Sequence, residues 1–206
     1  QYVGGIAGAN EEGGEITNTI SSIALHVKDK TKTAQYFGGV AGQNSGKIIG
    51  ATNENDVDVA AGDAIFVGGI VGENTESGAF IGEIANAGTV TGKANVGGII
   101  GQNLNTTLLN NSNEVERLVI TNSGYVYAEE GGAAGIFYDN SSAIVNADLS
   151  NAGEIKGGTS ATSVTGGLFG KNSGEITNST LTNNALVEGG GTDTGGIIGQ
   201  NSGNAE

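Results

Sequence analysis

The heptapeptide GGIIGQN at residues 97–103 decides the fold, because it returns without change at residues 195–201. Five further copies differ from it by a few residues, and the intervals between successive copies are 34, 30, 29, 37, 32 and 29 residues. Self-similarity at a spacing near 30 residues is typical of solenoids, in which each repeat forms one coil. We therefore expect a single repeat domain over residues 1–206, with seven coils that start near residues 4, 38, 68, 97, 134, 166 and 195.

The residues between the heptapeptides favour strands. Ile, Val, Thr and Tyr are frequent there and often alternate with polar residues, as in GEIK at residues 153–156. Gly accounts for 39 of the 206 residues, which penalises long helices. The exception is NEVERLVI at residues 113–120, which has helical character and lies in a unit with a seven- or eight-residue insertion. We predict an all-β chain that forms a parallel β-helix (β-solenoid) with about three short strands per coil and a right-handed sense.

Several columns of the repeat are predicted to stack from coil to coil. Two adjacent columns are apolar, and Asn ends each heptapeptide in a third. A fourth column, within the units, also holds Asn, and stacked amides would bond one coil to the next. The columns are Ile6, Val40, Ile70, Ile99, Ile136, Leu168 and Ile197; Ala7, Ala41, Val71, Ile100, Phe137, Phe169 and Ile198; Asn10, Asn44, Asn74, Asn103, Asn140, Asn172 and Asn201; and Asn86, Asn122, Asn151 and Asn183.

The composition excludes several classes of partner and cofactor. With 22 acidic and 8 basic residues the net charge is −14, which disfavours nucleic acid and anionic membrane surfaces. The chain has no Cys for metal–thiolate sites, and no apolar stretch long enough to insert into a membrane. Calcium-binding nonapeptides, EF-hand loops and phosphate-binding loops are missing from the sequence as well. We expect no cofactor and no metal site; the clusters Glu11/Glu12, Glu114/Glu116 and Glu129/Glu130 are interpreted as solubilising charge.

The search for catalytic residues favours a protein that is not an enzyme. His26 is the single histidine and is predicted to be an exposed strand residue. Asp56 and Asp58 alternate on one strand face and form the best candidate for a carboxylate pair, but the only arginine, Arg117, lies at another level in the insertion. Polysaccharide-cleaving β-helix enzymes need clustered carboxylates or carboxylate-bound calcium with a base. We predict no catalytic residues, with a carbohydrate-active enzyme domain as an alternative.

One segment carries a family resemblance. GGLFGKNSGEITNS at residues 166–179 resembles the GLUG motif of large bacterial surface proteins, including adhesin-like exoproteins. The resemblance covers essentially the whole chain, and it implies a repetitive stalk or adhesive segment at the extracellular bacterial cell surface. The motif brings no catalytic residues with it. The chain departs from the pattern at Tyr138, which replaces a glycine, and after Asn10 and Asn103, where the Ser-Gly step is missing.

The predicted function is a rigid solenoid stalk that presents or forms a binding surface for host or cell-surface glycans or proteins. Tyr125 and Tyr127 are the candidate ligand-binding residues, because aromatic faces stack on sugars. Neither end has an obvious polar cap, so we expect further coils or a second copy to continue the stack, and a self-assembling filament subunit is another alternative. Ice binding needs threonines at one coil position, and we expect no such regularity of Thr91, Thr162 or Thr182.

Overall fold

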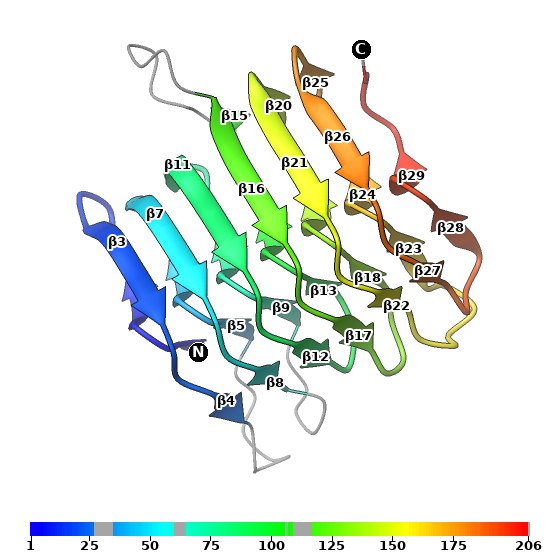
Figure 1. Cartoon of the computed structure of the whole chain (residues 1–206), viewed down its shortest axis with the longest axis horizontal. Helices are drawn as coiled ribbons and strands as arrows, with labels where there is room; N and C mark the ends of the chain where they lie inside the picture. Colours follow the sequence, from blue (N-terminus) through cyan, green and yellow to red (C-terminus); the bar gives the residue numbers. More distant parts are fainter. Residues whose placement is uncertain (27–34, 60–64, 106, 109–116, 206) are drawn as a thin grey trace.

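The computed structural model describes residues 1–26, 35–59, 65–105, 107–108 and 117–205. Within these residues the chain forms 29 strands and no helix. The strands pair in parallel, each with the equivalent strand of the next coil, so the coils lie side by side from the N-terminal to the C-terminal end (Figure 1). The predicted parallel β-solenoid is therefore confirmed, with about six full turns.

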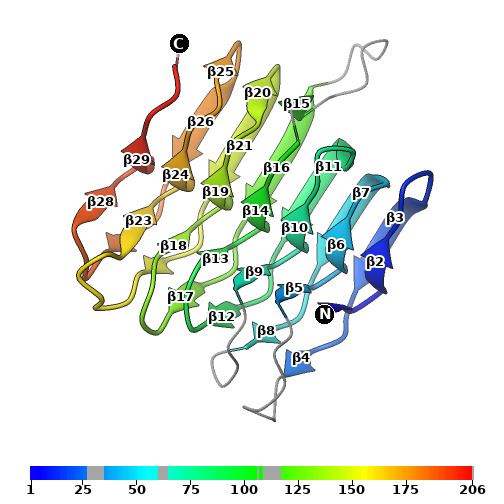
Figure 2. The same ribbon diagram turned by 180° about the vertical axis from the view of Figure 1, so that it is seen from behind.

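Two seven-stranded sheets run through the heptapeptides and face the viewer in Figure 2. The second glycine of each Gly-Gly pair and the apolar residue after it separate the two sheets, so the coil is divided more finely than the three strands predicted. Sheet A consists of β1 (Tyr2–Gly4), β5 (Tyr36–Gly38), β9 (Phe66–Gly68), β13 (Val96–Gly97), β18 (Ala133–Ala134), β23 (Val164–Gly166) and β28 (Asp193–Gly195). Sheet B consists of β2 (Ala7–Asn10), β6 (Ala41–Asn44), β10 (Val71–Asn74), β14 (Ile100–Asn103), β19 (Phe137–Asn140), β24 (Phe169–Asn172) and β29 (Ile198–Asn201).

Three further sheets complete the coil. Sheet C consists of β3 (Glu15–Ser21), β7 (Lys47–Asn53), β11 (Ala79–Asn86), β16 (Leu118–Asn122), β21 (Ala147–Asn151) and β26 (Thr180–Asn183). Sheet D consists of β4 (Leu25–His26), β8 (Val57–Asp58), β12 (Val90–Gly92), β17 (Val126–Ala128), β22 (Ile155–Lys156) and β27 (Val187–Glu188). Sheet E is short and consists of β15 (Thr107–Leu108), β20 (Ala143–Val145) and β25 (Ile176–Thr177).

The insertion lies at one corner of the fourth coil, between β15 and β16. Nine residues separate Leu108 from Leu118, whereas two separate their pairing partners Ile144 and Ala147, so the insertion has seven residues (nine minus two). In other coils this corner is a single residue with left-handed backbone, for example Asn146 with φ 56°. Asn adopts that conformation more readily than most residues. Sequence analysis predicted the size of the insertion but not its place at this corner.

The helical character assigned to residues 113–120 is contradicted in the last part of the segment. Residues 118–120 belong to β16, which pairs with β11 on one side and β21 on the other. Leu118 and Ile120 are fully buried there. Pairing on both edges and burial outweigh the weak local helix propensity of the segment. Residues 113–116 of that segment lie outside the described residues.

The apolar side chains form two separate cores. The first lies between sheets B and C and contains both predicted apolar columns, which are fully buried in the interior coils. The second lies between sheets A and D and is built mainly from valines, such as Val67, Val90 and Val126. The end coils are less covered: Ile6 is 47% exposed, whereas its neighbour in the column, Val40, is completely buried.

Both predicted asparagine columns form hydrogen-bonded ladders. In each rung the side-chain Nδ2 donates to Oδ1 of the asparagine in the next coil, at distances of 2.7 to 2.9 Å. The second ladder starts one coil earlier than predicted, at Asn53, whose Nδ2 donates to Asn86. In most rungs Nδ2 also donates to a backbone carbonyl oxygen two residues later, as from Asn86 to Gly88. The ladders therefore stabilise both the stacking of coils and the shape of each corner.

Candidate functional site

The side chains of one residue from each sheet D strand form a polar row along the rod. Strand register places these residues in successive coils at one position. The two predicted tyrosines belong here, because Tyr127 lies in the row and Tyr125 precedes it by two residues. The row consists of His26, Asp58, Thr91, Tyr127, Lys156 and Glu188.

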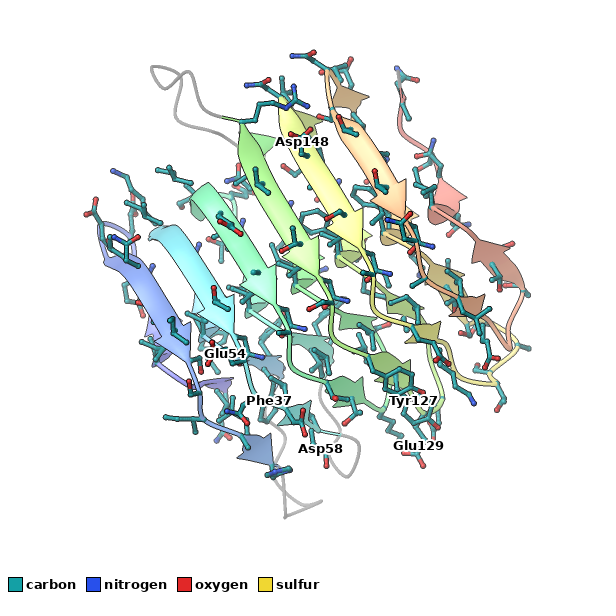
Figure 3. The ribbon with its side chains drawn as sticks, in the orientation of Figure 1. Phe37, Glu54, Asp58, Tyr127, Glu129 and Asp148 are labelled. Carbon is teal, nitrogen blue, oxygen red and sulfur yellow. The ribbon has the colours of Figure 1, made fainter. Side chains whose placement is uncertain are left out.

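The Tyr125 and Tyr127 rings lie side by side. Their centroids are 6.3 Å apart with an angle of 13° between the ring planes, and both side chains are half-buried. Figure 3 shows Tyr127 at the same margin of the molecule as Asp58. Burial raises the pKa of the Tyr125 hydroxyl, Lys156 opposes this shift, and Glu154 adds to it. The Tyr125 hydroxyl is therefore protonated at neutral pH and is available as a hydrogen-bond donor.

Polar side chains flank the two rings in both directions along the rod. On the N-terminal side, the Thr91 hydroxyl donates to Asp58 Oδ1 at 2.6 Å. On the C-terminal side, Lys156 Nζ lies 3.6 Å from Glu188 Oε2. We call Asp58, Thr91, Tyr125, Tyr127 and Lys156 the tyrosine surface. Aromatic rings with hydrogen-bonding groups on both sides are suited to a ligand with an apolar face and a polar rim, such as a sugar.

The candidate acid and base residues contact groups in the neighbouring coil. Asp56 Oδ1 accepts a hydrogen bond from the backbone nitrogen of Thr89 in the next coil, at 3.0 Å. His26 is exposed, as predicted, and its Nδ1 lies 3.5 Å from Asp58 Oδ2. Arg117 is held by Asp148, which Figure 3 shows at the opposite margin of the molecule from Asp58. The structure therefore does not bring the carboxylate pair and the arginine together.

The acidic clusters are exposed where the structure describes them. Glu11, Glu12 and Glu129 are exposed, and Glu130 Oε2 lies 3.9 Å from Lys93 Nζ. Glu114 and Glu116 lie outside the described residues. Among the residues that are described, no three acidic or histidine side chains lie close enough to hold a metal ion. In that same part of the chain, no helix is long and apolar enough to cross a membrane.

Three threonines share one position of sheet C, and two of them, Thr52 and Thr121, lie outside the set for which the sequence predicted no regularity. Strand register aligns Thr52, Thr121 and Thr182 in one row of sheet C, and Ala85 and Ser150 occupy the coils between them. The spacing of these residues along the chain varies, because the insertion precedes Thr121 and the register of β11 against β7 shifts between Ile81 and Ile84. The row is interrupted by Ala85 and ends at Ile20, so it is not a regular array of threonines.

A second candidate site surrounds Tyr138, which sequence analysis recorded only as a departure from the glycine pattern. An open pocket of about 330 Å³ lies beside this side chain, between the segments that precede β13, β18 and β23 of sheet A and the strands β19 and β24 of sheet B. It is lined by an aromatic residue, a cation, a carboxylate, an amide and two hydroxyls: Tyr138, Lys171, Glu130, Asn95, Ser160 and Thr162. The break in the glycine column was the signal in the sequence that could have located it.

Comparison of the chain with family models, with curated proteins and with solved structures finds no match. The resemblance to the GLUG motif therefore stays a prediction from the sequence. The tyrosine surface, the pocket beside Tyr138 and the solenoid that carries both are the structural features that bear on function.

Proposed function

We propose that this chain is a stalk segment of a bacterial cell-surface protein and that it contacts glycans through the tyrosine surface. The rod supports this proposal, because parallel pairing and two asparagine ladders connect every coil to the next. Such continuity gives a stiff element whose side surfaces keep a constant position relative to its ends. The GLUG-like repeat is the basis for placing it at the extracellular cell surface.

The paired rings of Tyr125 and Tyr127 are the observation that carries the glycan contact. Both rings remain half-exposed on a sheet face, although an apolar ring is more stable when it is buried. Thr91 and Lys156 place a hydroxyl and an ammonium one coil away on either side. A sugar ring stacked on either tyrosine would find hydrogen-bonding partners within one coil.

Binding of the full chain to an array of immobilised cell-surface glycans tests this proposal. We expect the wild-type chain to bind a subset of glycans and the double variant Tyr125→Ala/Tyr127→Ala to lose binding by about tenfold or more. Tyr2→Ala is the matched control, because Tyr2 is an exposed tyrosine in the first coil. A wild-type chain that retains no glycan, or a double variant that binds as well as wild type while giving the same β-rich circular dichroism, would contradict the glycan contact.

End-to-end association with a second copy is the alternative that a specific observation favours. Both ladders have a direction, since Nδ2 of each coil donates to Oδ1 of the next. At the C-terminal end Asn201 Nδ2 donates to the Gly203 carbonyl oxygen and lacks a following rung, and at the N-terminal end Asn10 Oδ1 lacks a preceding one. The two ends are thus complementary, and a head-to-tail contact of this kind would propagate into a filament.

Sedimentation velocity at increasing protein concentration tests this alternative. A charge at the exposed Ile6 should block the contact, so Ile6→Lys is expected to remain monomeric while wild type associates. Val145→Lys is the control, because Val145 is also exposed but lies in the fifth coil, away from both ends. A wild-type chain that stays monomeric at every concentration, or association that Ile6→Lys does not reduce, would exclude end-to-end stacking.

A further inference from the structure

Tyr138 stands where the repeat otherwise requires glycine. In the preceding coil a Cβ atom on Gly101 would lie 2.7 Å from the Gly72 carbonyl oxygen and 2.8 Å from Phe66 Cβ. The fifth coil accepts a tyrosine because the residue that it packs against, immediately before β18, is Gly132, where an added Cβ would lie 2.6 Å from Tyr138 Cε2. The ring packs at a tilt against Phe66, with centroids 6.4 Å apart and an angle of 49° between the ring planes. A position that breaks the repeat is therefore accommodated by a second, matching change.

Lys171 places its ammonium group over this ring, and Asp139 is its in-register neighbour on β19. Its Nζ lies 5.9 Å from the Tyr138 ring centroid, a distance at which the ring attracts a cation. The other four basic side chains in the described part of the chain each have a carboxylate within 4.0 Å, and Lys171 has none there: the four are Lys47, Lys93, Arg117 and Lys156. The ring attracts the ammonium group, and an incoming anion has no close ion pair of Lys171 to displace within the described residues.

The rest of the pocket offers neutral hydrogen-bonding groups. The hydroxyls of Ser160 and Thr162 lie 3.3 Å apart at its rim. Glu130 contributes a carboxylate whose charge is balanced by Lys93. Burial, assisted by Asp139, raises the pKa of Tyr138 to about 12, so its phenol stays protonated. The pocket volume of about 330 Å³ is at the lower end of the range for small-molecule sites.

We propose that the Tyr138 pocket, defined by Asn95, Glu130, Tyr138, Ser160, Thr162 and Lys171, binds an acidic monosaccharide unit of a glycan. The sugar carboxylate pairs with Lys171, and the ring hydroxyls bond to Ser160, Thr162 and Glu130. The net charge of −14 opposes an anion at long range, but salt screens charges beyond about 8 Å at physiological ionic strength. The contact with Lys171 is shorter than that and decides the binding. This site is separate from the tyrosine surface and goes beyond the function proposed for it.

Titration of the ¹⁵N-labelled full chain with sodium D-glucuronate, followed by amide chemical shifts, tests the proposal. D-glucose and sodium acetate are the comparison ligands. Glucose has the ring hydroxyls but no carboxylate, and acetate has a carboxylate but no sugar ring. We expect saturable shifts at residues 130–138 and 160–171 with glucuronate, and at least about tenfold weaker binding of glucose and of acetate. Added sodium chloride should weaken the binding of glucuronate.

Variants separate this pocket from the tyrosine surface. Lys171→Gln should lower glucuronate affinity by about tenfold or more, while Lys47→Gln, which makes the same charge change on sheet C, should leave it unchanged. The double variant Tyr125→Ala/Tyr127→Ala should also bind glucuronate normally, so the two proposals fail independently. Equal binding of glucose and glucuronate, equal binding of acetate, shifts elsewhere on the rod, or full affinity in Lys171→Gln would each overturn the assignment.

Discussion

The side chain of Asn86 packs directly on Gly69, the second glycine of the third heptapeptide. A Cβ atom on Gly69 would lie 2.6 Å from Asn86 Cγ and 2.1 Å from the carbonyl oxygen of Gly98 in the next coil. The same relation joins Gly39 to Asn53 and Gly98 to Asn122. The Gly-Gly pair and the second asparagine column are therefore two halves of one contact, which brings the backbone between sheets A and B against the ladder.

This contact predicts that Gly69→Ala is strongly destabilising. The added methyl group has to displace both the ladder and a backbone carbonyl, and we expect the free energy of unfolding to fall by about 2–3 kcal/mol. Gly196→Ala is the matched control, since Gly196 occupies the same position in the last heptapeptide and a Cβ there meets no atom within 4 Å. Equal losses for the two variants in urea denaturation would show that the asparagine contact is not the cause.

An interior asparagine of a ladder should contribute more to the free energy of unfolding than a terminal one. Asn86→Ala leaves Asn53 Nδ2 and Asn122 Oδ1 without their partner in a buried position. We expect a loss of about 2–4 kcal/mol in the free energy of unfolding. Asn201→Ala, at the exposed end of the first ladder, removes a single bond from Asn172 and should cost about 1 kcal/mol or less. If urea denaturation gave equal losses in the free energy of unfolding for Asn86→Ala and Asn201→Ala, an interior rung would contribute no more than a terminal one.

The second ladder can be extended by one rung at the N-terminal end. Ser21 pairs in register with Asn53, and both Ser21 Oγ and Asn53 Oδ1 are buried without a hydrogen-bond partner. Ser21→Asn should supply the missing donor and raise the free energy of unfolding by about 1 kcal/mol. Ser21→Ala, which only removes the unsatisfied hydroxyl, serves as the control. If thermal unfolding finds the asparagine variant no more stable than the alanine variant, the ladder does not continue into the first coil.

The ion pair beside the insertion should make stability depend on acid pH. Arg117 donates to both carboxylate oxygens of Asp148, at 3.0 and 2.7 Å, and these hydrogen bonds, with one from Thr180, lower the pKa of Asp148. A carboxylate with a lowered pKa in the folded chain stabilises it at neutral pH, and this contribution is lost as pH falls below about 4. Partial exposure makes the effect modest.

Unfolding measured between neutral and strongly acidic pH checks this dependence. The loss of stability on acidification should be smaller in Asp148→Asn than in wild type. Asp193→Asn, which removes a carboxylate from the last coil, should follow the wild-type curve. Parallel curves for wild type and Asp148→Asn would mean that the Arg117 pair contributes nothing in solution.

Several features were predictable because they repeat. The asparagine at position 74 recurs at 103 and 140, and stacking at one-coil spacing brings each directly over the next. Errors arose where the spacing drifts. Asn53 was left out of the second ladder. Residues 118–120 were given helical character because local propensity was the only guide beside the insertion.

The amino-acid sequence by itself determined the coil, its apolar columns and its ladders, since in a parallel stack a residue's neighbour is its own counterpart one repeat away. Only the tertiary structure decided which glycine positions tolerate a side chain and which of the residues that depart from the repeat contact one another. Tyr138 and Lys171 lie on neighbouring strands of sheet B, and Gly132 comes immediately before β18 of sheet A. The repeat predicts that these coils are neighbours, but the fit of the Tyr138 ring against Gly132 and beneath Lys171 is a property of the whole packed coil rather than of any one segment.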